Sequence, residues 1–182
     1  MNIKKNVLIT GCAGFIGYHL TLKLLKSNYR VVGIDNINSF YSKRLKLDRI
    51  NNLKKYTKQN KKNFYFYKFD LSNQTKLNKI FKKFNFKKVF HLAAQAGVRY
   101  SLIFPDRYLK SNILSFFNIL ESCRKSKVAK LIFASSSSVY GNLNKKKFSE
   151  TDNTDTPIQF YAATKKSNEV MAHSYSALYG IH

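Results

Sequence analysis

The chain has 182 residues, 44% of them hydrophobic and 15% aromatic, which excludes a disordered protein and fits one domain with a buried core. Lysine and arginine number 33 against 9 aspartate and glutamate residues, so the net charge is +24. Proteins that bind nucleic acids or membrane surfaces carry such charge. However, the lysines are scattered and the residues of AT-rich codons abound, so we favour biased composition, and we expect no nucleic acid and no membrane as partners.

Apolar, strand-like runs alternate with helical patterns along the chain. In chain order, the predicted elements are a strand at 7–10, a helix at 15–26, a strand at 30–34, a helix at 45–56, a strand at 64–69, a helix at 77–84, a strand at 89–92, a helix at 111–123, a strand at 131–135 and a helix at 161–179. Such alternation builds right-handed βαβ units. The sequence therefore predicts an α/β fold: one domain over residues 1–182, with a Rossmann-like doubly wound parallel sheet and helices on both faces.

Three glycines at steps of three separate the first predicted strand from the first predicted helix, in the stretch "TGCAGFIG". Gly11 permits a sharp turn, Gly14 lets the backbone approach a phosphate, and Gly17 lets the helix pack closely on the strand. The N–H groups of the helix N-terminus would face the anion. The spacing is G-x-x-G-x-x-G rather than G-x-G-x-x-G, so a plain glycine turn is the alternative interpretation.

Asp35 ends the second predicted strand, in "VVGIDN". A carboxylate at this place accepts hydrogen bonds from both ribose hydroxyls of an adenosine and repels a 2′-phosphate. The alternative is an aspartate that caps a loop. Together with the upstream glycines, Asp35 predicts a dinucleotide site that takes NAD rather than NADP.

Candidate catalytic groups lie near the fifth predicted strand and the last helix. The strand runs into the serine cluster "ASSSSVYG", where a hydroxyl could bond a reacting oxygen, although turn serines are an alternative. Tyr161 and Lys165 are four residues apart and share one helix face. A neighbouring ammonium and a nicotinamide cation would both lower the pKa of a tyrosine, which is about 10 when unperturbed. Tyr161 could then move a proton near neutral pH.

Other segments predict less. Residues 142–160 read as a polar connection over the edge of the active site. The chain stops at "SALYGIH", where another strand is expected, so we expect the N-terminal part of a longer protein whose C-terminal substrate-binding part is absent. Cys12 and Cys123 form neither a disulfide framework nor a metal site, and His91 reads as a packed histidine. No apolar run reaches the ~18 residues of a membrane helix, and a cytoplasmic protein is expected.

The quoted stretches, together with "FDL", "HLAAQAGVRYS", "SNILSFFNILE" and "YAATKKSNEVMAHSY", resemble the extended short-chain dehydrogenase/reductase family, also called the NAD-dependent epimerase/dehydratase family. The resemblance runs from residue 7 to about residue 180. Within the family the chain is most similar to the 4-epimerases of UDP-glucuronate. The resemblance implies NAD as cofactor, a UDP-sugar as substrate, a homodimer and a place in polysaccharide biosynthesis.

The resemblance also implies roles for individual residues. Tyr161 would be the catalytic acid/base, Lys165 would hold the nicotinamide ribose, and Ser136 would be the catalytic hydroxyl, with Ser135 and Ser137 as alternatives. Arg99 would reach the sugar carboxylate or a phosphate, so the implied substrate-binding residues are Arg99, Ser136 and Tyr161. The implied cofactor-binding residues are Gly11, Gly14, Phe15, Ile16, Gly17, Asp35, Asn36, Asp70, Leu71, Leu92, Ala93, Ala94, Asn112, Tyr161 and Lys165.

The serine cluster also bears on the type of reaction. The family's dehydratases and decarboxylases carry an acidic residue shortly after the catalytic Ser/Thr, and dehydration needs an acid for the departing hydroxyl. Ser137 and Ser138 stand here instead, which favours epimerisation by hydride removal at C4, rotation of the 4-keto sugar and hydride return. The alternatives are a dehydratase, decarboxylase or reductase of the same family, an inactive NAD-binding fragment, and a nucleic-acid-binding protein.

Overall fold

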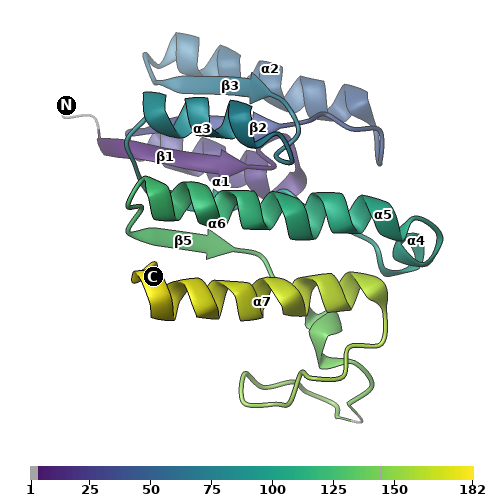
Figure 1. The fold of residues 1–182 in the computed structure, drawn as a ribbon. Helices are drawn as coiled ribbons and strands as arrows, with labels where there is room; N and C mark the ends of the chain where they lie inside the picture. Colours follow the sequence, from purple (N-terminus) through teal and green to yellow (C-terminus); the bar gives the residue numbers. More distant parts are fainter. Residues whose placement is uncertain (1–3, 144) are drawn as a thin grey trace.

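The computed structural model describes residues 4–143 and 145–182, and a five-stranded parallel sheet forms its centre (Figure 1). The strand order is β3-β2-β1-β4-β5, and every neighbouring pair is parallel. This order confirms the predicted α/β, Rossmann-like doubly wound sheet. The strands are β1 (Lys4–Thr10), β2 (Tyr29–Asp35), β3 (Phe64–Lys68), β4 (Phe86–His91) and β5 (Lys130–Phe133).

Helices cover both faces of the sheet, because successive strand side chains point to opposite sides. Leu8 packs into one core with α3, α6 and α7, while its neighbours Val7 and Ile9 pack into a second core with α1 and α2 (Figure 1). The helices are α1 (Phe15–Lys26), α2 (Lys43–Gln59), α3 (Gln74–Lys83), α4 (Val98–Ile103), α5 (Pro105–Tyr108), the π-helical η1 (Leu109–Leu114), α6 (Ser115–Lys125), the 3-10 turn η2 (Ser137–Tyr140) and α7 (Phe160–Tyr179).

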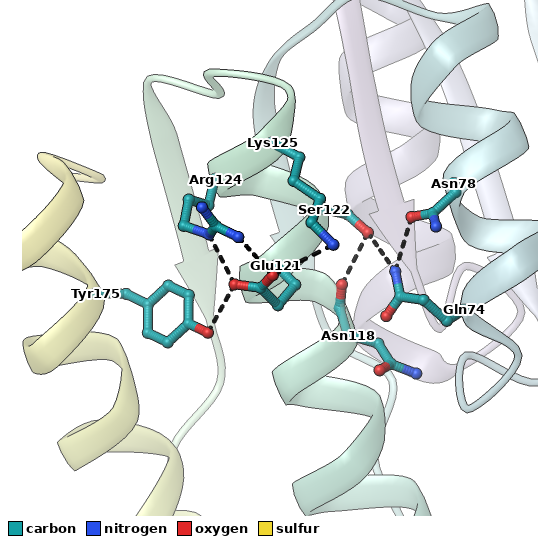
Figure 2. A network of polar contacts seen from close by, with 8 residues as sticks. All are labelled: Gln74, Asn78, Asn118, Glu121, Ser122, Arg124, Lys125 and Tyr175. Atoms are coloured by element: carbon teal, nitrogen blue, oxygen red, sulfur yellow. Dashed lines mark hydrogen bonds and ion pairs between the residues drawn. The ribbon is translucent and has the colours of Figure 1, made fainter.

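A polar network ties α6 to the helices on either side of it (Figure 2). Glu121 accepts hydrogen bonds from Arg124 on its own helix, at 2.8 Å, and from the Tyr175 hydroxyl on α7, at 2.9 Å. The hydrogen bond from Arg124 is the main cause that lowers the pKa of Glu121 to about 2. On the other side, Gln74 of α3 donates to the hydroxyl of Ser122. The three helices on this face are therefore joined by side chains as well as by apolar packing.

The connection from η2 to α7 forms a loop that closes on itself. Gly141 has a φ of +59°, and a Cβ there would lie 2.6 Å from the carbonyl oxygen of Thr156. Within the loop, Phe148 reaches back to η2, where its ring stacks on that of Tyr140 with centroids 4.5 Å apart. We call the Gly141–Thr156 contact the neck of the loop.

The last residues run beside β5. The backbone N–H of Leu131 donates to the carbonyl of His182 at 2.8 Å, and the N–H of His182 donates to the carbonyl of Ala129 at 3.2 Å. Within residues 4–143 and 145–182, no helix combines the length and apolar character needed to cross a membrane.

Candidate functional site

A cavity of about 400 Å³ opens at the carboxyl ends of the strands. The loops that follow β1, β2, β3 and β4 line it, so it lies where the strand order reverses, the usual ligand site of such sheets. The predicted cofactor residues that line this cavity are Gly11, Gly14, Phe15, Ile16, Gly17, Asp35, Asn36, Asp70, Leu71, Leu92, Ala93 and Ala94. The structure thus brings together residues that are up to 83 positions apart in the chain.

The glycine turn leaves no room for side chains. A Cβ on Gly17 would lie 2.1 Å from the carbonyl oxygen of Gly11, and one on Gly14 would lie 3.0 Å from the same atom. Gly11 itself has a φ of +70°. The α1 helix starts after Gly14 without a side-chain cap, and its N-terminus faces the cavity. This bare backbone, with N–H groups and a helix dipole, fits a pyrophosphate.

Asp35 braces the glycine turn and also faces the cavity. Its Oδ2 accepts a hydrogen bond from the N–H of Ala13 at 3.1 Å, and its Oδ1 accepts one from the N–H of Ile37 at 2.9 Å. A carboxylate has about four lone-pair sites, so each oxygen can accept a further bond from a ribose hydroxyl. The loop-cap interpretation and the ribose interpretation of Asp35 are therefore compatible.

Asn36 and Asp70 join the ends of β2 and β3 at the same cavity. Asn36 donates through Nδ2 to the carboxylate of Asp70 at 3.0 Å. Burial works to raise the pKa of Asp70, but hydrogen bonds from Ser72 and Asn36 outweigh it and lower the pKa below its usual value. This carboxylate is therefore held ionised beside the expected adenine position.

Lys46 is a cavity residue that the sequence analysis missed. It lies in α2, within the predicted helix at 45–56, and its side chain is buried and lines the cavity. Its Nζ donates to the side chain of Asn38 at 2.6 Å and lies 4.3 Å from the centre of the Tyr41 ring. Burial lowers the pKa of Lys46, although the nearby charge of Asp35 opposes this. Among 33 basic residues, no local signal distinguishes this lysine.

His91 is packed in the core, as expected. Thr10 Oγ1 accepts hydrogen bonds from the N–H groups of Leu92 and Ala93, both at 3.2 Å. Its own proton must therefore go to His91 Nδ1, 2.9 Å away, which places the imidazole proton on Nε2. Burial, aided by the charge of Lys165, lowers the pKa of His91 to about 3. This neutral histidine helps to hold the loop after β4 beneath the cavity.

We expect the burial of His91 to make the protein acid-sensitive. The unfolded chain takes up a proton at this histidine below about pH 6.5, whereas the folded chain resists it down to about pH 3. Acid therefore favours unfolding in this window, and the free energy of unfolding should fall by about 1.4 kcal/mol per pH unit through this one group. The free energy of unfolding, measured with urea at pH 6, 5 and 4, should depend less steeply on pH in His91→Gln than in wild type. His173→Gln, at an exposed position, should keep the original slope; equal slopes in all three proteins would contradict the prediction.

The candidate catalytic residues lie at the side of the cavity formed by β5 and α7. Lys165 is buried, and its Nζ donates to the carbonyl of Ala134 at 3.0 Å, a residue that lines the cavity. Burial lowers the pKa of Lys165 to about 8. Tyr161 lies one turn earlier on α7, with its ring 6.0 Å from that of Tyr108. Neither Tyr161 nor Lys165 is among the lining residues of the cavity itself.

The serines after β5 are engaged in different ways. Ser136 begins η2, and its Oγ accepts a hydrogen bond from the N–H of Ser138 at 3.2 Å. The hydroxyl of Ser135 instead donates to Glu169 on α7. Ser137 is exposed. None of the three lines the cavity, so Ser136 stays a prediction with Ser135 and Ser137 as its alternatives.

Asn112 is buried and does not line the cavity, but it bonds to a residue that does. Its side chain accepts from the N–H of Gln95 at 2.8 Å, donates to the Gln95 carbonyl at 3.1 Å and donates to Thr164 at 3.0 Å. Arg99 differs: it lies exposed on α4 and does not line the cavity. None of the described residues of the loop 142–160 lines the cavity, so its course over the edge of the active site stays a prediction.

The comparisons with known proteins agree with this geometry. A family model described as GDP-mannose 4,6 dehydratase matches residues 8–182. Protein CapI of Staphylococcus aureus is 51% identical over 175 residues, which are 96% of this chain and 51% of that protein. UDP-glucuronate 4-epimerase 4 of Arabidopsis thaliana is 43% identical over 176 residues, which are 96% of this chain and 39% of that protein.

A solved structure extends the likeness to three dimensions. The crystal structure of UDP-glucuronic acid 4-epimerase from Bacillus cereus, in complex with UDP-glucuronic acid and NAD, matches with a TM-score of 0.85 and 37% identity. The match covers 97% of this chain and 54% of that chain. The chain thus spans about half the length, or less, of the curated relatives that it matches.

Proposed function

The chain belongs to the NAD-dependent epimerase/dehydratase family, and from this membership we propose that it is the NAD-binding domain, residues 1–182, of a nucleotide-sugar 4-epimerase. The single observation that carries the proposal is the cavity itself. It combines a turn in which a Cβ on Gly11 or Gly17 would clash with backbone atoms, a carboxylate at the end of β2 and a buried lysine that reaches the cavity wall through Ala134.

We propose that NAD lies across the cavity, with its pyrophosphate on the glycine turn. Asp35 and Asn36 would take the adenosine ribose, and Asp70 and Leu71 would flank the adenine. Leu92, Ala93 and Ala94 would run beneath the cofactor, while Lys165 would hold the nicotinamide ribose and Asn112 would support the site from behind. All of these but Asn112 and Lys165 line the cavity, and those two bond directly to residues that do.

In the proposed reaction NAD, when bound, supplies reversible hydride transfer. Tyr161 takes the proton of the sugar's C4 hydroxyl as the alcohol becomes a ketone, and it returns a proton after the keto sugar has turned over. Ser136 donates a hydrogen bond to the reacting oxygen. Lys165 is mostly protonated near neutral pH, since its pKa is about 8, so it would bring a positive charge to the nicotinamide ribose.

We propose UDP-glucuronate as the substrate and UDP-galacturonate as the product. The proposal is supported by the similarity to the Arabidopsis and Bacillus enzymes named above. Arg99 would reach the carboxylate of the sugar, and its exposure on α4 leaves it available for such a contact. An anionic substrate also suits a chain with a net charge of +24.

A 4,6-dehydratase is the second candidate, because the matching family model carries that description. Dehydration needs an acid beside the catalytic hydroxyl. Ser137 and Ser138 stand after Ser136, and a hydroxyl group cannot serve as that acid near neutral pH. We therefore favour epimerisation.

A homodimer is part of the proposal. Large apolar side chains lie exposed on the η1–α6 segment and on α7, among them Leu114 (45% exposed), Phe117 (43%) and Val170 (58%). Helices with such faces usually pack against a partner. Light scattering after size-exclusion chromatography should give twice the mass of the chain.

The test of the function uses protein expressed from the complete reading frame. Purified protein is denatured, and the released nucleotide is identified as NAD or NADP by its mass. A second sample is incubated with UDP-glucuronate and followed by proton NMR. We expect NAD and the appearance of UDP-galacturonate; a 4-keto-6-deoxy product or carbon dioxide release would instead indicate a dehydratase or a decarboxylase.

A further inference from the structure

The N-terminus of α7 is capped by a residue from a different helix. Gln159 occupies the N-cap position and provides no side-chain cap. Tyr161 is the second residue of the helix, and its N–H is one of those that a capping side chain normally satisfies. Here it donates to the hydroxyl of Ser101 on α4, 60 residues away, at 3.2 Å. The same hydroxyl donates to the Val98 carbonyl at 2.6 Å.

The geometry gives Ser101 little freedom to do anything else. It is 1% exposed, and its hydroxyl both accepts from α7 and donates within α4. The other backbone group of Tyr161 is held as well, because Thr164 donates to the Tyr161 carbonyl at 2.7 Å and itself accepts a hydrogen bond from Asn112. Side chains therefore fix Tyr161 at both its N–H and its carbonyl.

A second residue of the same region fixes the ring. Tyr108 is fully buried, and its hydroxyl lies 2.8 and 2.5 Å from the carbonyl oxygens of Ala96 and Gly97, between which it shares its one proton. Its ring meets that of Tyr161 at 74°, edge to face, with centroids 6.0 Å apart. Ala96 lines the cavity, so Tyr108 links the cavity wall directly to the Tyr161 ring.

We propose that Ser101 is a positioning residue for Tyr161: as a cap supplied from α4, it sets the start of α7 and so the place of the phenol relative to the cavity, with Tyr108 as the lateral support of the ring. This role rests on the proposed function of Tyr161, since only a reacting phenol needs such placement. Loss of the hydroxyl would free the first turn of α7 without removing any group that touches a ligand.

The first test measures amide exchange by NMR in wild type, Ser101→Ala, Ser101→Thr and Ser122→Ala. Ser122 is a matched control, because it is equally buried at 1% and hydrogen-bonded on both sides, but it lies in the network of α3 and α6 (Figure 2). We expect the Tyr161 amide to exchange about fivefold faster in Ser101→Ala than in wild type. Its exchange rate should return to the wild-type value in Ser101→Thr and stay at that value in Ser122→Ala.

The second test compares the affinities for NAD and for ADP, which lacks the nicotinamide half. Ser101→Ala should lower the affinity for NAD about fivefold, because a displaced start of α7 also shifts Lys165, which would hold the nicotinamide ribose. The affinity for ADP should not change, and Ser101→Thr should restore the affinity for NAD. If the affinities for NAD and ADP fall equally, or the affinity for NAD does not fall, Ser101 has only a structural role and its positioning role is overturned.

The two tests keep this inference separate from the proposed function. If wild-type protein binds neither NAD nor ADP, the proposed function fails, while the exchange of the Tyr161 amide still decides whether Ser101 places it. If Ser101→Ala does not fold, wild-type protein decides: a Tyr161 amide that exchanges as fast as in an unstructured peptide overturns the inference, and protection that persists in Ser101→Thr supports it.

Discussion

Gly17→Ala is expected to weaken NAD binding by about 100-fold. The new Cβ would lie 2.1 Å from the carbonyl oxygen of Gly11 and 2.8 Å from its carbonyl carbon. Both are backbone atoms of the turn that would hold the pyrophosphate, so the turn must open or α1 must move away from it. Overpacking of this kind costs about 3 kcal/mol, which corresponds to about 100-fold in affinity if the distortion must be reversed for binding. Isothermal titration with NAD measures the effect directly.

Two further glycines provide a graded comparison. A Cβ on Gly14 would lie 3.0 Å from the Gly11 carbonyl oxygen, so Gly14→Ala should weaken NAD less than Gly17→Ala does. Gly180 has no heavy atom within 4 Å of its Cβ position and has a φ of +64°, which asparagine tolerates. Gly180→Asn should therefore bind NAD like wild type. Gly17→Ala protein with wild-type NAD affinity would contradict a pyrophosphate site at this turn.

Tyr161→Phe is expected to reduce epimerisation by about 1,000-fold in the protein expressed from its complete reading frame. The substitution removes the group proposed to move the C4 proton, and general acid–base catalysis contributes about 10² to 10⁴ in rate. The ring remains, so its contact with Tyr108 and the backbone bonds of residue 161 should persist. The affinity for NAD should therefore change by less than about threefold. Conversion of UDP-glucuronate is followed by NMR, and NAD binding is measured on the same preparation.

Tyr175→Phe is the control for the loss of a phenol from α7. Tyr175 lies on the same helix, and its hydroxyl bonds to Glu121 in the network of Figure 2, away from the cavity. Tyr175→Phe should lower the free energy of unfolding and leave the rate of epimerisation unchanged. A Tyr161→Phe protein that keeps more than a tenth of the wild-type rate would assign the proton transfer to another residue.

Much of the fold could be predicted because its signals are local. Each strand is a short run rich in β-branched and aromatic residues, and the predicted helix at 15–26 has the bounds that the structure shows for α1. The glycine turn could be predicted for the same reason, since its three glycines stand together between a strand and a helix, and Asp35 favoured the dinucleotide interpretation over a plain turn. Asp35 could be named as a candidate ribose ligand because it lies at the end of a predicted strand.

The remaining features depend on contacts between distant segments. Lys46 resembles any surface lysine until α2 packs against the loop after β2. Ser101 and Tyr108 acquire their contacts with Tyr161 only when α4 and α5 lie against α7. The helices α4 and α5 are short and interrupted by Pro105, so no regular period marks them in the sequence. The predicted helix at 111–123 joins the end of the π-helical η1 to α6.

The neck at Gly141 and Thr156 brings the two ends of the loop together, and Thr154 and Asp155 next to it bond to Lys166 of α7. Because the loop enters and leaves at one point, its length can change without altering the span between β5 and the first turn of α7. Evolution or an engineer could therefore lengthen or shorten the loop between Phe148 and Thr154, while the phenol of Tyr161 keeps its place.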